Sequence, residues 1–254
     1  MRMEEVMQQL EEMGTSQNVK IYTRHGASEP MFGVSFANLR TLQKKIKRDH
    51  ALAVELWNTG NLDARMLATM IAEPGKLDRA DAEARARQVS YHHLVDQLCS
   101  NVLGPAPYAR DLAEQWIDSD DEWLGRFGWN LAGELADRDP DLPDEYFLRL
   151  VEATEDRIHE AKNRTREAMN TTLIRIGIRN SRLQEAATRA GERIGPVDVD
   201  QGDTSCKTPY APDYIAKTMK RREEQARKRA EKARAKKTGA KAQATRCLSP
   251  IVPE

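Results

Sequence analysis

Hydrophobic residues recur at helical spacing along most of the chain. In residues 1–13 every third or fourth position is apolar, which predicts a helix with one apolar face. Ser35, Asp78 and Ser90 each precede a similar pattern and are predicted to be helix N-caps. Glycine and proline stand between the patterns, where they end helices. The expected helices cover residues 1–13, 18–25, 36–46, 50–57, 62–72, 79–89, 91–103, 108–117, 121–135, 144–151, 155–162, 164–178, 181–193 and 213–237.

The pattern predicts an all-α protein. Alternating runs rich in valine, isoleucine and threonine are missing, and the commonest residues are good helix formers. Pairs of short helices recur at roughly 35–45 residues, which is the period of HEAT-type repeats. Such pairs stack into a curved solenoid with a concave surface. No clear sequence repeat is visible, so an irregular helical globule is the alternative.

Charge divides the chain into three parts. We expect a helical repeat domain at 1–195, a polar strap or linker at 196–212 and a basic, partly disordered helical tail at 213–254. Lysine and arginine balance aspartate and glutamate at 40 each, but 13 basic residues face three acidic ones between Lys217 and Arg246. The tail has too few large apolar residues to bury a core by itself. It is predicted to be a nonspecific nucleic-acid arm; a solvated helix or an arm docked on the acidic body are the alternatives.

Cysteines and hydropathy exclude several classes of protein. The three cysteines (Cys99, Cys206 and Cys247) are widely spaced, and no CxxC or Cys/His cluster indicates a disulfide framework or structural zinc. The first residues carry Glu4 and Glu5 and lack an apolar signal region, and no apolar run is long enough to span a membrane. We therefore expect a cytoplasmic monomer that uses no cofactor, no metal and no membrane.

Two stretches carry the candidate chemistry, since phosphate-binding glycine loops and the common hydrolase and kinase motifs are absent. In the first, His92 and Asp96 are four residues apart and share one helix face. Aspartate is a mediocre helix former, so its position inside the helix is notable. The alternative is a surface carboxylate paired with a histidine.

The second stretch runs from Trp116 to Trp129. Ser119 or Asp120 is expected to start a helix that carries Arg126. Gly125 and Gly128 cost helix stability and indicate the close approach of another backbone or of a ligand. The alternative is that the tryptophans belong to the core and that Arg126 is a surface ion-pair partner.

Together these stretches resemble the AlkD-type DNA alkylation repair enzymes, a family of HEAT-like repeat DNA glycosylases. The segment 117–126, Ile-Asp-Ser-Asp-Asp-Glu-Trp-Leu-Gly-Arg, is similar to the family signature. Residues 33–40, 60–65 and 164–170 resemble other repeats of the family, and the likeness covers residues 3–195. It implies a solenoid that holds double-stranded DNA in its concave groove and hydrolyses the N-glycosidic bond of alkylated purines.

The resemblance also implies roles for particular residues. Asp96 matches the family's catalytic carboxylate and Arg126 the assisting arginine, expected to hold a phosphate by paired hydrogen bonds. A purine alkylated at N3 or N7 is cationic and leaves as a neutral base, so no strong general acid is needed. The sugar becomes oxocarbenium-like, and one carboxylate stabilises it and orients a water.

The chain departs from the family where aromatic rings are expected beside the lesion. His92, with Tyr91 beside it, stands where the family has a tryptophan, and Thr171 lies near a second tryptophan position. Asp96 would favour a protonated His92, which would repel a cationic lesion. Either His92 stays neutral and replaces the ring contact poorly, or the chain acts on another lesion, or it has lost catalysis.

Seven basic residues are candidates to line the groove and bind phosphates with a salt-dependent affinity. A noncatalytic DNA-binding protein and a helical scaffold for a protein partner are the alternative functions. The candidates are Lys44, Lys45, Arg48, Arg164, Arg166, Arg175 and Arg179.

Overall fold

A computed structural model describes residues 1–246, with side chains to Lys232. Thirteen α-helices and no strand occur in this part of the chain, so the all-α prediction is confirmed. An isolated bridge joins Gly14 to Val34. Residues 247–254, which belong to the tail predicted to be partly disordered, lie outside the described residues.

The helices begin and end close to the predicted positions. Those of the amino-terminal half are α1 (Met3–Met13), α2 (Ser16–Arg24), α3 (Phe36–Ile46), α4 (His50–Asn58), α5 (Leu62–Ile71), α6 (Arg79–Ala86) and α7 (His92–Leu98), which continues as the π-helical turn η1 (Cys99–Leu103). Those of the carboxyl-terminal half are α8 (Ala109–Trp116), α9 (Glu122–Arg138), α10 (Asp144–Arg157), α11 (Asn163–Gly177), α12 (Ser181–Ile194) and α13 (Ala211–Arg246).

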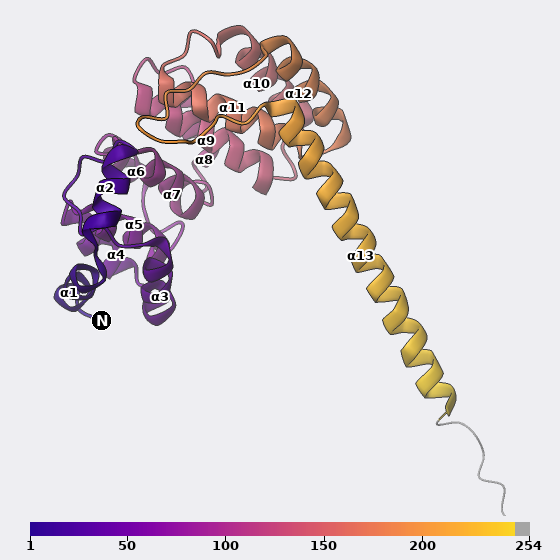
Figure 1. Cartoon of the computed structure of the whole chain (residues 1–254), viewed down its shortest axis with the longest axis horizontal. Helices are drawn as coiled ribbons and strands as arrows, with labels where there is room; N and C mark the ends of the chain where they lie inside the picture. Colours follow the sequence, from indigo (N-terminus) through magenta and orange to yellow (C-terminus); the bar gives the residue numbers. More distant parts are fainter. Residues whose placement is uncertain (247–254) are drawn as a thin grey trace, which may run out of the picture.

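The odd-numbered helices from α3 to α13 form one layer of an arch. Each of them packs against the next odd-numbered helix, so that α7, α9 and α11 are consecutive members of this row. Helices α4, α8 and α12 pack against the row from the other layer. In Figure 1 the helices curve from α1 to α12, and α13 runs away from the end of the arch. This stacking is why side chains from three different repeats meet at one place.

Three details of the helix prediction are wrong. The helix that carries Arg126 does not start at Ser119 or Asp120, because its N-cap is Asp121. Ser90 does not cap α7: the N-cap is Tyr91, whose side chain makes no capping hydrogen bond. The break predicted after Val151 is absent because α10 is continuous, with Val151 and Thr154 both on its buried face. The hydroxyl of Thr154 donates to the carbonyl of Leu150 at 2.7 Å, so this polar side chain is satisfied within the helix.

The glycines of α9 are sites of close helix packing, as the sequence indicates. A Cβ atom on Gly128 would lie 2.5 Å from the backbone nitrogen of Ile117, at the end of α8. A Cβ atom on Gly125 would lie 2.9 Å from the hydroxyl of Thr165 on α11. The two glycines therefore let α9 pack tightly between its neighbours, which fixes the direction of the side chains that α9 presents.

Residues 195–210 form no helix, and we call this segment the strap. It is fastened to the start of α11, where the side chain of Asn163 makes hydrogen bonds of 2.7 and 2.9 Å with the backbone of Asp200. Arg166 donates to the carbonyl of Asp198 at 2.9 Å. The chain then enters α13, whose buried Ile215 packs on Gly177.

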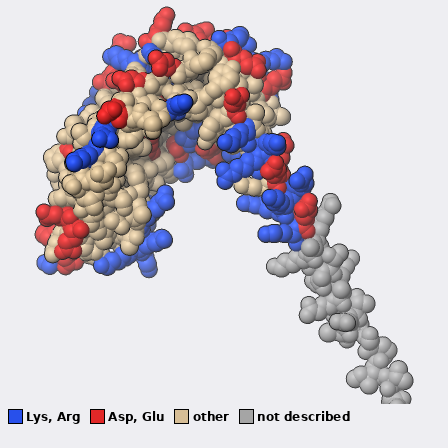
Figure 2. Space-filling model, viewed as in Figure 1, with Lys and Arg blue, Asp and Glu red and all other residues tan. Residues whose placement is uncertain are grey.

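No helix in the described part of the chain is both long and apolar enough to cross a membrane. Figure 2 shows a hollow between the amino-terminal half of the arch and α13. Lysine and arginine side chains gather over α3 on one flank of this hollow and over α13 on the other.

Candidate functional site

A pocket of about 430 Å³ lies where α7, α9 and α11 meet the strap. Five of the residues singled out from the sequence line it, and they come from three helices that are far apart along the chain. They are His92, Asp96, Arg126, Thr171 and Arg175.

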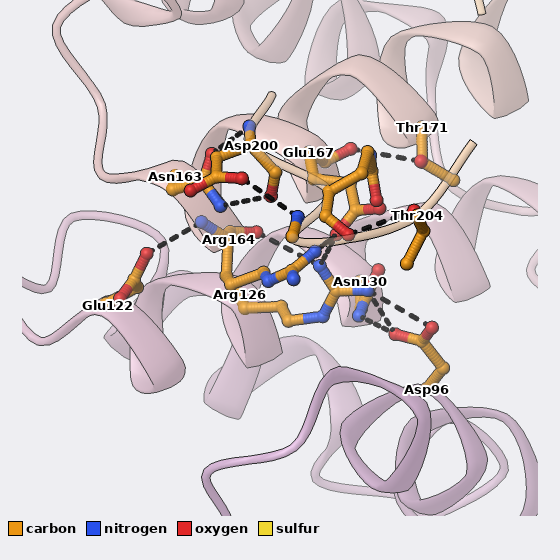
Figure 3. Close-up of polar contacts among 12 residues, drawn as sticks. Asp96, Glu122, Arg126, Asn130, Asn163, Arg164, Glu167, Thr171, Asp200 and Thr204 are labelled. Carbon is orange, nitrogen blue, oxygen red and sulfur yellow. Dashed lines mark hydrogen bonds and ion pairs between the residues drawn. The ribbon is translucent and has the colours of Figure 1, made fainter. Parts of the chain in front are cut away.

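Asp96 of α7 is held by two residues of α9 (Figure 3). The guanidinium of Arg126 donates to both carboxylate oxygens of Asp96, at 2.9 and 3.1 Å, and the amide of Asn130 donates to one of them at 2.8 Å. Because Arg126 and Asn130 are four residues apart, they project from the same face of α9. The Asp96 side chain remains 41% exposed, whereas that of Arg126 is only 5% exposed. The carboxylate is thus fixed in place and open to the pocket.

Arg126 also pairs with Glu167 of α11, at 2.7 Å. Burial disfavours the charge of Arg126, but the two carboxylates outweigh it and raise the pKa of the guanidinium. Burial likewise opposes the charge of Glu167, but Arg126 and Arg164 lower its pKa to about 2. Arg126 was expected to hold a DNA phosphate; it is instead buried between protein carboxylates.

The start of α9 aligns it with α11. The carboxylate of Asp121 caps α9 by accepting from the amides of Trp123 and Leu124, at 3.0 and 2.9 Å. Glu122 then accepts a hydrogen bond from the backbone amide of Arg164 at 2.7 Å (Figure 3). This contact links the amino-terminal ends of the two helices and so sets the position of Glu167 relative to Arg126.

Burial favours the neutral form of His92, contrary to the effect expected from Asp96. Burial lowers the pKa of His92 to about 2, and the charges of His93, Arg126 and Arg164 act in the same direction. Burial also lowers the pKa of His93. The expected proximity effect is outweighed because Asp96 is bonded to Arg126, and the imidazole loses water on entering the pocket wall.

The other two residues expected to contact the substrate have different surroundings. Tyr91 is buried behind the histidines, with its ring 5.0 Å from that of His92, and it does not line the pocket. Burial raises the pKa of its hydroxyl well above the ordinary value. Thr171 does line the pocket, and its hydroxyl donates to the carbonyl of Glu167 at 3.0 Å.

The seven basic candidates divide into two groups. Lys44 and Lys45 of α3 are exposed, and Lys45 donates only to Gln9, at 3.1 Å. The five arginines use their donors within the protein. Arg48, Arg166 and Arg179 bind backbone carbonyls, Arg164 binds Glu167, and Arg175 binds Glu134 and Asp137.

The strap closes one side of the pocket and was not expected there. Pro209 accepts a hydrogen bond from the amide of Asn170 at 3.0 Å, and Gln201 donates to Glu167 at 3.3 Å. Cys206 also lines the pocket. Sequence reasoning noticed the polar composition of this segment but had no rule that places an irregular segment on a particular surface.

The pocket residues that were not predicted include His25, His93, Asn130 and Glu167. Asn130 and Glu167 carried a usable signal, because each is one helical turn from a residue already singled out. His25 carried none, since it lies in a distant helix.

The sequence matches the family model described as DNA alkylation repair enzyme over residues 6–215. The chain belongs to this family. A solved structure that is 32% identical superposes with a TM-score of 0.78, covering 87% of this chain and 95% of that one. It is described as a new family of proteins related to the HEAT-like repeat DNA glycosylases with affinity for branched DNA structures. The predicted HEAT-like solenoid is confirmed.

Two curated proteins that are similar to this chain are described only as uncharacterized proteins. The uncharacterized proteins Lin0241 of Listeria innocua and Lmo0209 of Listeria monocytogenes are 27% and 26% identical to it over 220 residues. Each alignment covers 84% of this chain and 95% of the relative.

Proposed function

We propose that this family member binds damaged double-stranded DNA in its hollow and hydrolyses the N-glycosidic bond of cationic, alkylated purines, with Asp96 as the catalytic carboxylate. One observation carries the proposal. Asp96 is held by Arg126 and Asn130 yet stays exposed to a pocket on the inner row of helices. Such a fixed carboxylate stabilises positive charge that develops on a sugar and has no need to reorganise during the reaction.

Arg126 acts here as a positioning residue. Its paired hydrogen bonds fix the carboxylate plane of Asp96, and its second partner Glu167 anchors the guanidinium from the opposite side. Both carboxylates share the one buried positive charge, so Asp96 keeps negative character toward the pocket. The neutral imidazole of His92 adds no positive charge that would repel a cationic purine.

The histidines and the strap favour a second candidate function, binding of branched DNA without base release. Among the described residues, the pocket is lined by three imidazoles and by no tryptophan, phenylalanine or tyrosine. The strap, through Gln201 and Pro209, covers the α11 side of the pocket. A related solved protein is described as having affinity for branched DNA structures.

A base-release assay on methylated duplex DNA separates the two functions. The wild-type protein is expected to release methylated purine, and Asp96→Asn is expected to lower the rate about a hundredfold or more, since it removes the charge and keeps the shape. Asp118→Asn is the matched control, because Asp118 also pairs with an arginine, Arg157, but lies away from this pocket.

The two proposed functions predict different outcomes of these assays. Equal base release by wild type and Asp96→Asn would exclude Asp96 as the catalytic group. No release by wild type, together with tighter binding of a four-way junction than of a linear duplex, would establish the second function. Weak binding of both DNAs at low salt would exclude both functions.

A further inference from the structure

Three histidines gather at one corner of the pocket, and the proposed glycosidic chemistry does not use them. His25 is the C-cap residue of α2, and His92 and His93 are the first two residues of α7. One ring nitrogen from each lies within 4.8 Å of the others. The ring centroids of His92 and His93 are 4.2 Å apart, and those of His25 lie 6.2 and 6.1 Å from them.

The ring nitrogens of these histidines are not used by the protein's own hydrogen bonds. Among the described residues, none of the three imidazoles forms a hydrogen bond with protein, in contrast to His159, which bonds the carbonyl of Ile194 at 2.9 Å. Only His92 is buried, and all three rings line the pocket. Their nitrogens are open to the pocket rather than sealed in the core, so the cluster presents ring nitrogens that are suited to an outside ligand.

We propose that His25, His92 and His93 form a binding site for a divalent transition-metal ion of the zinc class. Imidazole nitrogen suits zinc, copper, nickel and iron, whereas magnesium and calcium prefer oxygen ligands. A tetrahedral zinc ion with Zn–N bonds of about 2.0–2.1 Å has its ligand atoms roughly 3.3 Å apart. The three nitrogens, within 4.8 Å of one another in this structure, would have to move closer to reach that spacing.

The surroundings determine the kind of site. The C-terminal end of α2 favours a cation and the N-terminal end of α7 disfavours one, so the helix dipoles offset each other. Three protein ligands and an open position are typical of catalytic rather than structural zinc sites. That open position would face the pocket that Asp96 also lines.

Zinc titration of the full chain, purified without a histidine tag, tests this site. The probe is Zn²⁺ alone, measured by competition with a chromophoric chelator, and Co²⁺ provides a visible spectrum for tetrahedral coordination. One equivalent is expected to bind the wild type. Loss of a second-sphere partner already costs about 10- to 100-fold in affinity, so His25→Gln and His93→Gln are expected to weaken binding at least about a hundredfold.

Matched controls are available because the chain has five histidines. His50→Gln and His159→Gln lie outside the cluster and are expected to keep wild-type affinity. His25 is only half-buried, so His25→Gln tests the site even if a His92 variant fails to fold. Wild-type protein without stoichiometric zinc, or equal affinity in His25→Gln and His159→Gln, would overturn the proposal. Because the titration contains no DNA, its result is independent of the proposed function.

Discussion

The guanidinium of Arg126 donates hydrogen bonds to both carboxylate oxygens of Asp96, although the two residues are 30 positions apart and belong to different repeats. The pair sits at the point where α7, α9 and α11 converge, and its arginine is almost completely buried. A buried charge depends on its partners, because the cost of removing it from water is large. The pair therefore links the stability of the arch to the geometry of the candidate site.

Substitution of Arg126 tests that link. Arg126→Ala leaves Asp96 and Glu167 without their shared positive charge, and we expect a loss of about 3–5 kcal/mol in the free energy of unfolding. Arg126→Lys keeps the charge but cannot donate in the paired geometry, so it should restore stability only in part. Urea denaturation measures both effects.

An exposed ion pair provides the control. Arg182 pairs with Glu145 at 2.8 Å, and both side chains are more than half exposed. Arg182→Ala is expected to cost less than about 1 kcal/mol. Equal losses for Arg126→Ala and Arg182→Ala would show that the buried pair has no special role in stability.

The ion pairs of Glu167 should make the stability of the folded chain depend on pH. Its pKa in the folded chain is lowered to about 2, from an ordinary value of 4.5. Because the folded-state pKa is lowered, the contribution of Glu167 is fully present above about pH 5 and is lost as the pH falls toward 2. Its upper bound is roughly 3 kcal/mol.

Thermal unfolding of wild type and Glu167→Gln between pH 7 and pH 2 measures this contribution. Glu167→Gln should be less stable at pH 7, and the difference in melting temperature should shrink as the solution becomes more acidic. Experiments in the presence of a chelator exclude any effect of bound metal. A difference that stays constant over the whole range would contradict the assigned ion pairs.

The hydrogen bonds of Asn163 are expected to hold the strap against α11. Asn163→Ala removes both hydrogen bonds to the backbone of Asp200, and amide exchange within residues 196–210 is expected to become faster. Peptides from α5 serve as an internal reference because this helix is buried and distant in the row. Unchanged exchange in the strap would mean that its other contacts are sufficient.

The basic residues of α13 predict the salt dependence of DNA binding. Replacing Lys228, Arg229 and Lys232 with glutamine should weaken duplex binding, and each lost phosphate contact should reduce the slope of log affinity against log salt by about 0.9. Arg182→Gln and Arg189→Gln on α12 are control changes in the other layer. Equal slopes for the wild type and the triple variant would show that α13 is not a DNA arm.

The sequence by itself determined the helices and the location of the candidate chemistry. Spacing of apolar residues and N-caps such as Ser35 are local signals, so they were predictable without the fold. The family resemblance added Asp96 and Arg126 as site residues. The break expected after Val151 was wrong, and the absence of glycine and proline from α10 is a local signal that favoured a continuous helix.

Only the tertiary structure decided which groups face one another. The contacts of Arg126 with Asp96 and Glu167 span 30 and 41 positions, and no local rule determines such pairs. The stacking of α7, α9 and α11 made Arg126 a buried partner of two carboxylates rather than a phosphate ligand. The same stacking brought His25 to His92 and laid the strap beside the pocket. These relationships follow from long-range packing, which depends on the shapes of whole helices rather than on the sequence near any one residue.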